Sequence, residues 1–140
     1  MSEVTVKQIS GATFAARGSS NHWTMIDVAE SVGGQAAASG PMEMVLFGLG
    51  GCTGVDVENM LRKMKIPIQH FEIKIHAERA EEHPKVYTSI QMTYHFYGER
   101  LPLPKLERAV KLSKETYCSV SAMLGATVDI STKIEVHPST

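Results

Sequence analysis

Two cysteines, Cys52 and Cys118, are the side chains of this sequence best suited to covalent chemistry. A deprotonated thiol is a strong nucleophile, and two thiols that meet in a fold can cycle between dithiol and disulfide. Cys52 lies in an apolar, glycine-rich run, and Cys118 lies between two predicted helices, near the amino end of the second. A helix amino terminus stabilises a thiolate through its free N–H groups and its dipole. The alternative is that either cysteine is only a small buried hydrophobe.

Patterns typical of metal and phosphate sites are absent from the sequence. The six histidines form no His-x-x-x-His pair and the cysteines form no Cys-x-x-Cys pair, so the sequence predicts no zinc site. His76 and His95 lie on predicted strands and could meet across a sheet, but exposed or hydrogen-bonded histidines are the simpler expectation. The glycines between positions 48 and 54 lie in a predicted helix and precede no Lys-Ser or Lys-Thr, which excludes a phosphate loop.

Length and charge narrow the classes of protein further. A chain of 140 residues predicts a single domain, residues 1–140. The 14 basic and 15 acidic side chains give a net charge of −1, which argues against a nucleic-acid binder and gives no reason to expect a membrane surface as partner. The first residues show no secretory signal, so we expect a cytoplasmic protein whose cysteines are reduced thiols.

The elements that must position the thiols follow from hydrophobic periodicity. Residues 4–16 and 23–28 predict three strands in an antiparallel meander, and residues 33–40 predict a flexible connection. Residues 41–64 predict a helix that begins at Pro41 and stops before Pro67. Its first half is apolar nearly all round, which predicts burial on every side. Its four glycines indicate close approach of another backbone, either a second helix or a partner's copy of the same helix.

The second half of the chain predicts further strands and helices. Two alternating segments, residues 71–78 and 86–97, predict a strand pair, each strand with one wet and one buried face. A helix from 102 to about 117, a short helix over 119–126 and a strand over 127–136 complete the chain. The order of elements predicts an α+β domain with the sheet on one side and helices on the other.

Two motifs resemble one known family. Gly50-Gly51-Cys52 within a helix that opens at Pro41, and Tyr117-Cys118-Ser119-Val120-Ser121 after an amphipathic helix, resemble the osmotically inducible protein C and organic hydroperoxide resistance family. The resemblance covers nearly the whole chain and is strongest over residues 41–56 and 106–120. It implies a two-layer α+β fold with antiparallel sheets around a buried central cysteine helix, in an intertwined homodimer.

The resemblance also implies an activity. In that family the first cysteine, here Cys52, attacks an organic hydroperoxide and becomes a sulfenic acid, and the second, here Cys118, resolves it as a disulfide. A dithiol, often a protein-bound lipoyl group, reduces the disulfide, and neither a metal nor an organic cofactor takes part. The sites lie at the subunit interface.

The resemblance implies a cation beside the nucleophile, because an apolar helix disfavours a thiolate. In the family an arginine from the N-terminal strands serves, oriented by a glutamate directly after the proline of the cysteine helix. Arg17 is the matching candidate, or else a solvated turn residue. Met42 occupies the glutamate position, and the acid comes one place later as Glu43. Glu43 either orients Arg17 from another angle or only complements the helix dipole.

Three hypotheses remain open at the level of sequence. The first is a peroxidase acting on organic hydroperoxides through Cys52 and Cys118, with Arg17 and Glu43 in support. The second is a redox-sensing or ligand-binding dimer of the same fold with little or no turnover, which the displaced acid and Ser119, where many family members have proline, both motivate. The third is a structural or ligand-carrying protein with inert thiols.

Overall fold

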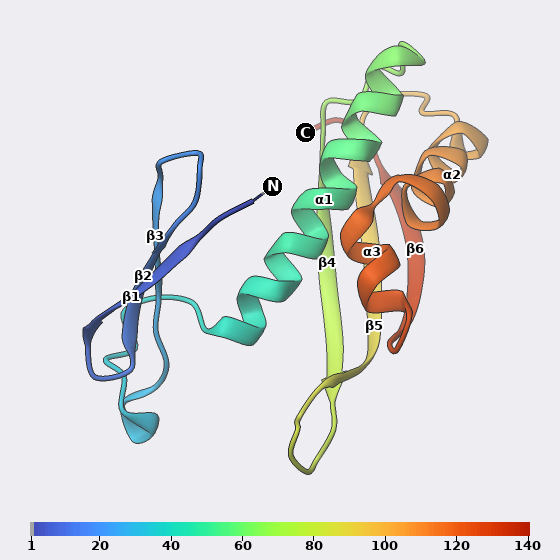
Figure 1. The fold of residues 1–140 in the computed structure, drawn as a ribbon. Coiled ribbons are helices and arrows are strands. Elements are labelled where there is room, and N and C mark those ends of the chain that lie inside the picture. The colour runs from blue at the N-terminus through green and yellow to red at the C-terminus, as the bar shows by residue number, and fades with distance from the viewer. Residues whose placement is uncertain (1) are drawn as a thin grey trace. The chain divides into compact units, whose positions relative to one another are not determined.

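A computed structural model describes residues 2–140, which form two compact units (Figure 1). The N-terminal unit extends to Phe47, and the C-terminal unit comprises Gly48–Thr140. The boundary falls within helix α1 (Pro41–Lys63). Both cysteines belong to the C-terminal unit, so this unit holds the thiol chemistry.

The N-terminal unit contains a three-stranded antiparallel sheet, as the sequence predicts. Its strands β1 (Thr5–Ser10), β2 (Thr13–Arg17) and β3 (Trp23–Ile26) lie side by side in chain order. A short 3₁₀ helix, η1 (Glu30–Val32), follows the sheet. The meander is confirmed.

The connection after this sheet, expected to be flexible, is organised by the buried carboxylate of Asp27. It accepts hydrogen bonds from the backbone N–H groups of Val28, Gln35 and Ala37 and from the Thr13 hydroxyl, at 2.8–3.2 Å. Burial acts to raise the pKa of Asp27, but these hydrogen bonds outweigh it and lower that pKa below its usual value. A carboxylate that satisfies so many donors fixes the path of the loop.

Helix α1 begins and ends as the sequence predicts, but only one of its faces is buried in the chain. The buried side chains follow one another at intervals of four and are Leu49, Thr53, Val57 and Leu61. In the first half of the helix, where the sequence predicts burial on every side, Phe47 is 54% exposed. The prediction of burial on every side is therefore wrong for the single chain, because one sheet can cover only one stripe of a helix.

Gly50 explains how α1 comes so close to the sheet of its unit. A Cβ atom at Gly50 would lie 3.1 Å from Cδ1 of Ile75, a residue of the neighbouring strand. At Gly48 and Gly51 a Cβ atom would meet nothing within 4 Å. A strand side chain therefore approaches α1 closely at Gly50, whereas the predicted approach of another backbone to the glycine run is not found within the described residues.

The C-terminal unit is a three-stranded sheet covered by helices on one face (Figure 1). Strands β4 (His70–Arg79) and β5 (Tyr87–Tyr97) are antiparallel, whereas β6 (Asp129–His137) runs parallel to β5. The parallel pair departs from the expected antiparallel sheets. A parallel partner requires a long crossover, and here the chain returns through α2 (Leu103–Leu112), the π-helical turn η2 (Ser113–Tyr117) and α3 (Ser119–Gly125).

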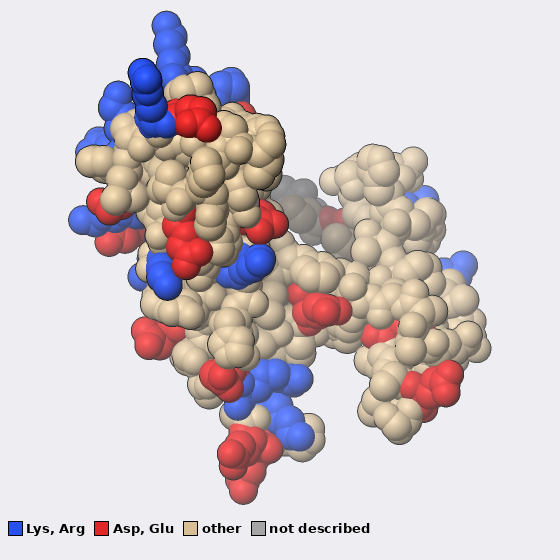
Figure 2. All heavy atoms as spheres, turned by 180° about the vertical axis from the view of Figure 1, so that it is seen from behind, with Lys and Arg blue, Asp and Glu red and all other residues tan. Residues whose placement is uncertain are grey.

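The core of this unit lies between the sheet and the helices. It is formed by fully buried apolar side chains, chiefly Leu49, Leu61, Met92, Tyr94, Phe96 and Leu106. Strand β4 alternates between half-buried and exposed residues, so its other face is open to solvent. Lysine, arginine, aspartate and glutamate intermingle on the face that Figure 2 presents, in keeping with the balanced charge. Within residues 2–140, no helix has the length and apolar character needed to cross a bilayer.

Candidate active site

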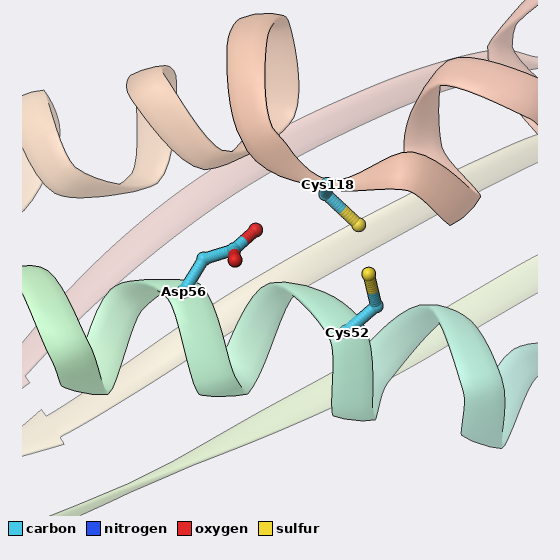
Figure 3. A group of neighbouring side chains, drawn as sticks. All are labelled: Cys52, Asp56 and Cys118. Atoms are coloured by element: carbon cyan, nitrogen blue, oxygen red, sulfur yellow. The ribbon is translucent and has the colours of Figure 1, made fainter.

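Cys52 is carried by α1 and shares its face of the helix with one acidic side chain. Asp56 follows four residues later, so the two side chains lie one turn apart on the same side of the helix. Figure 3 shows both pointing toward the segment that carries Cys118. Cys52 is half-buried, which leaves its sulfur within reach of a small reactant.

Cys118 lies at the junction of η2 and α3, as the sequence predicts. It is the N-cap of α3: its sulfur accepts a hydrogen bond from the Ser121 N–H at 3.4 Å, and its own N–H donates to the Ser113 carbonyl at 2.8 Å. Only 2% of the residue is exposed. The backbone N–H and the sulfur of Cys118 are thus both fixed by hydrogen bonds, the first to Ser113 and the second to the start of α3.

The two thiols and Asp56 converge on one point. The two Sγ atoms and a carboxylate oxygen of Asp56 all lie within 4.8 Å of one another. Both cysteines are free thiols in this structure. A disulfide needs a sulfur–sulfur distance of about 2.05 Å, so the two sulfur atoms must move toward each other for the bond to form. The same three groups form a set of soft and carboxylate donors that a metal ion such as zinc could use.

Burial controls the protonation of the inner thiol. It raises the pKa of Cys118 above the usual value, and the neighbouring Cys52 acts in the same direction, while Ser121 acts to lower it. Cys118 therefore rests as a neutral thiol at neutral pH. A protonated, buried Cys118 beside a more accessible Cys52 suits an order of events in which Cys52 reacts first.

A chain of buried hydroxyl groups leads away from Asp56. The Ser113 hydroxyl donates to the Asp56 carboxylate at 3.0 Å and lies 2.7 Å from Thr53 Oγ1, which in turn lies 2.7 Å from the Tyr94 hydroxyl. Ser113 has one hydroxyl hydrogen, which it gives to Asp56, so it accepts from Thr53, and Thr53 accepts from Tyr94. The hydrogen bonds between these hydroxyl groups therefore all point the same way, toward the Asp56 carboxylate.

A pocket opens beside this cluster and shares Asp56 with it. Its volume is about 420 Å³, within the range of small-molecule sites. Both apolar side chains and the basic groups of Lys63 and Arg108 line it. Its lining residues are Asp56, Asn59, Met60, Lys63, Met64, Arg108, Leu112 and Tyr117.

The other two predicted site residues belong to the N-terminal unit, where each has a partner. Arg17 donates to Asn21 Oδ1 at 3.2 Å, and its guanidinium lies 4.9 Å from the centre of the Trp23 ring. Glu43 accepts a hydrogen bond from the Gly40 N–H at 3.2 Å, in the manner of a capping box. This contact favours the second of the two roles left open for Glu43, at the positive end of the helix.

Comparison with known proteins identifies the family. The model of the OsmC-like protein family matches residues 33–133. Protein YhfA of Escherichia coli K12 is 38% identical over 134 residues, which are 96% of this chain and 97% of that protein. The chain belongs to the OsmC-like family.

Solved structures of other proteins share the fold of this chain. A hypothetical protein from Aquifex aeolicus has a TM-score of 0.87 at 33% identity, with 100% of this chain and 98% of that one covered. An organic hydroperoxide resistance protein OsmC from Legionella pneumophila has a TM-score of 0.72 at 14% identity, with 96% of each chain covered. At that low identity the second likeness shows the fold alone. The expected two-layer α+β fold is therefore confirmed.

Sequence reasoning brought Cys52 and Cys118 together correctly in this OsmC-like chain but missed Asp56. Its spacing of four from Cys52 on a helix was the available signal. Thr53, Ser113 and Tyr94 carried no such signal, because they come from three separate elements and are ordinary residue types for buried positions.

Proposed function

We propose that this OsmC-like protein is a thiol peroxidase that reduces organic hydroperoxides to alcohols. The observation that carries the proposal is the convergence of Cys52, Cys118 and Asp56 next to a pocket. Family membership supports it, since the Legionella relative of the same fold is described as an organic hydroperoxide resistance protein.

The reaction requires two steps at sulfur and one external reductant. The Cys52 thiolate attacks the terminal oxygen of the hydroperoxide, the O–O bond breaks, and the products are a Cys52 sulfenic acid and an alkoxide that takes up a proton. The Cys118 thiol then attacks the sulfenic sulfur and releases water, forming a Cys52–Cys118 disulfide. A dithiol, of the lipoyl type, returns both cysteines to thiols and becomes a disulfide itself. No metal or organic cofactor enters this cycle.

Asp56 is suited to move the proton in the first step. Its carboxylate lies within 4.8 Å of the Cys52 sulfur, so it can accept the thiol proton and return it to the departing alkoxide. The hydrogen bond from Ser113 holds the carboxylate in place. The family resemblance alone implies Arg17 as the cation that stabilises the thiolate, and we propose that Glu43 acts at the helix cap.

The pocket suggests how the substrate is held. Met60, Met64 and Leu112 offer an apolar surface to the organic group of the peroxide, and Asp56 marks the end nearest the thiols. An organic hydroperoxide can place its organic group on the apolar surface and its peroxide group near Asp56. Hydrogen peroxide has no organic group to contact the apolar surface. We therefore expect higher kcat/KM for alkyl and aryl hydroperoxides than for hydrogen peroxide.

We further propose that the working form is a homodimer. One face of α1 carries Gly48, Gly51 and the exposed Val55, a surface on which a second helix could pack closely. Burying such an apolar stripe contributes roughly 25 cal/mol per Å². Sedimentation equilibrium tests this step, and a monomer at micromolar concentration would contradict it.

The test of the activity is steady-state consumption of cumene hydroperoxide with dihydrolipoamide as reductant. The wild-type protein should turn over, Cys52→Ser should be inactive, and Cys118→Ser should accumulate a sulfenic acid at Cys52 that a dimedone-type reagent captures. Full activity in Cys52→Ser would overturn the mechanism. Oxidation of both thiols without sustained turnover would instead favour the redox-sensing dimer.

A further inference from the structure

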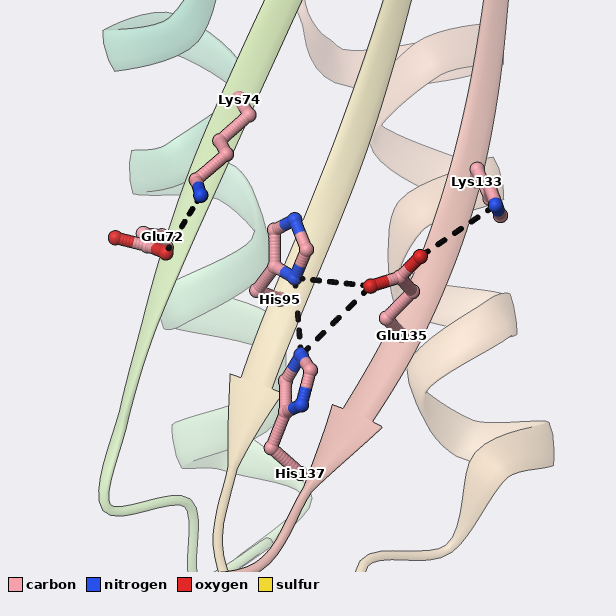
Figure 4. Close-up of polar contacts among 6 residues, drawn as sticks. All are labelled: Glu72, Lys74, His95, Lys133, Glu135 and His137. Carbon is pink, nitrogen blue, oxygen red and sulfur yellow. Dashed lines mark hydrogen bonds and ion pairs between the residues drawn. The ribbon is translucent and has the colours of Figure 1, made fainter. Parts of the chain in front are cut away.

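Three potential metal ligands meet on the face of the C-terminal sheet that the helices do not cover (Figure 4). His95 belongs to the central strand β5, and Glu135 and His137 belong to β6. Glu135 is the register partner of His95, and His137 follows two residues later on the same face. One ligand atom from each residue lies within 4.8 Å of the others.

Whichever ring nitrogens carry hydrogen, at least one of the three contacts among these side chains is not a hydrogen bond. His95 Nδ1 lies 2.9 Å from His137 Nε2 and 3.3 Å from Glu135 Oε2, and His137 Nε2 lies 3.9 Å from the same oxygen. Each ring nitrogen holds at most one hydrogen, and the carboxylate oxygen only accepts. If both nitrogens are protonated, two donors face each other at 2.9 Å; if only one is, it must share a single hydrogen between two acceptors. A cation at the centre removes this conflict, because all three atoms then present lone pairs.

The spacing of the three atoms fits a tetrahedral zinc ion. Zinc binds histidine nitrogen and carboxylate oxygen at about 2.0–2.2 Å, which places neighbouring ligand atoms roughly 3.3–3.5 Å apart. The three distances between the ligand atoms here are 2.9, 3.3 and 3.9 Å, one below this range, one at its lower end and one above it. Changes of a few tenths of an ångström, within reach of side-chain rotation, would complete the geometry.

The surroundings hold the ligands in place. The His95 side chain is only 13% exposed although it lies on the outer face. The His95 and His137 rings stack with centroids 5.2 Å apart, and Tyr97 stacks on His137 at 4.7 Å. Lys133 contacts Glu135 Oε1 at 3.4 Å, which leaves Oε2 for the histidines. Outer contacts of this kind orient metal ligands, and the ammonium of Lys133, on a side chain that is 61% exposed, can turn into water when a dication binds.

We propose that His95, Glu135 and His137 bind a zinc ion through His95 Nδ1, His137 Nε2 and a Glu135 oxygen. Three protein ligands leave a fourth position for water or for a small anionic ligand. The ion would join β5 to the last strand of the chain. This site is separate from the thiols: α1 packs on the sheet face of Ile75, whereas His95 lies on the opposite face. A test of zinc binding at this site is therefore independent of the proposed peroxidase activity.

Local spacing in the sequence predicted no zinc site. For His76 and His95, a meeting across the sheet was one possibility, and exposed or hydrogen-bonded histidines were the simpler expectation. Register shows that His76 and His95 do not meet: His95 lies opposite Glu72 on β4, and His76 lies opposite Gln91. The partner of His95 on the other side comes from β6, 40 residues later in the chain, and no short motif reports that pairing.

Zinc titration of the full-length chain tests the proposal. Because Cys52, Asp56 and Cys118 form a second donor set, the titration uses the double variant Cys52→Ser, Cys118→Ser, made metal-free and checked for folding by circular dichroism. We expect one equivalent of zinc with micromolar or tighter affinity, and tetrahedral absorption bands when Co²⁺ replaces it. His95→Gln and His137→Gln should each weaken binding by roughly 100-fold or more. The control is His76→Gln, an exposed histidine on β4, which should leave binding unchanged.

The wild-type chain gives a second measurement that does not depend on the double variant. There His95→Gln should remove one equivalent of bound zinc and leave any zinc held by the thiols. Absence of stoichiometric binding in the thiol-free chain, or equal affinity in His95→Gln and His76→Gln, would overturn the proposal.

Discussion

The Ser113 hydroxyl lies 2.7 Å from Thr53 Oγ1 and joins the helix that carries Cys52 to the segment that carries Cys118. The same Ser113 hydroxyl donates to Asp56, and its carbonyl accepts from the Cys118 N–H. One buried residue therefore sets the spacing of the thiols and of the carboxylate beside them. Because Ser113 is fully buried, water cannot replace these bonds when a partner is removed.

Thr53→Val should destabilise the protein by about 1–3 kcal/mol, because it leaves the hydroxyls of Ser113 and Tyr94 short of a buried partner. Urea unfolding measures the loss. Thr88→Val is the matched control, since its hydroxyl makes only an exposed bond of 3.3 Å, and it should change stability by less than about 0.5 kcal/mol. Equal losses in the two variants would show that the buried chain of hydroxyls adds no stability.

Tyr94 should ionise later than an ordinary tyrosine. Burial raises its pKa above 10.0, and negative charge on Cys118 and Asp56 acts in the same direction. The folded protein thus holds the phenol proton more tightly than the unfolded chain does. The resulting stability is complete below pH 10 and is lost as pH rises through the folded pKa.

Ultraviolet absorbance titration measures this difference, with Tyr94→Phe as the comparison. The substitution should remove the last-titrating fraction of the tyrosine signal, and it should reduce the loss of stability as pH rises above 10. If Tyr94→Phe removed an early-titrating fraction instead, Tyr94 would not be the tyrosine with the raised pKa.

Asp56→Asn should slow peroxide reduction by about 10²–10⁴-fold, the usual contribution of a positioned acid–base group. The amide oxygen can still accept from Ser113, so the fold should persist. Stopped-flow oxidation of Cys52 by cumene hydroperoxide measures the rate in the variant and in the wild-type protein. Asp129→Asn changes an exposed carboxylate in the same unit and should have the wild-type rate. Wild-type kinetics in Asp56→Asn would exclude the proton transfer.

Asp27→Asn should destabilise the N-terminal unit, because an amide group offers hydrogens where the backbone offers N–H donors. Since hydrogen bonds hold the pKa of Asp27 below 3.8, its contribution is present above that pH and is lost as pH falls through the lower, folded value. Hydrogen exchange at the Ala37 amide reports the effect. The Ala37 amide should exchange fast in Asp27→Asn at every pH. It should exchange slowly in the control Glu30→Gln, which changes an exposed residue nearby.

The helices and strands of this chain could be predicted because each is marked locally. Pro41 and the apolar run fix α1, and strict alternation over residues 71–78 fixes β4. The meeting of Cys52 and Cys118 came from family resemblance rather than from periodicity. Local patterns thus gave the elements, and the resemblance supplied their pairing.

Contacts between distant strands could not be predicted in this way. The parallel pairing of β6 with β5 depends on how the crossover packs, and it alone brings His137 to His95. The one-sided burial of α1 likewise depends on which neighbours are present. In each case the sequence pattern is compatible with more than one tertiary arrangement.

The central claim is that Cys52 and Cys118 form a reversible redox pair. Its most direct test is mass spectrometry of the intact protein after one equivalent of cumene hydroperoxide, before and after addition of dihydrolipoamide. The account predicts rapid loss of two hydrogens, a peptide map with a Cys52–Cys118 link, and full recovery with the dithiol. Thiols that stay unchanged, or that over-oxidise slowly without a link, would contradict it.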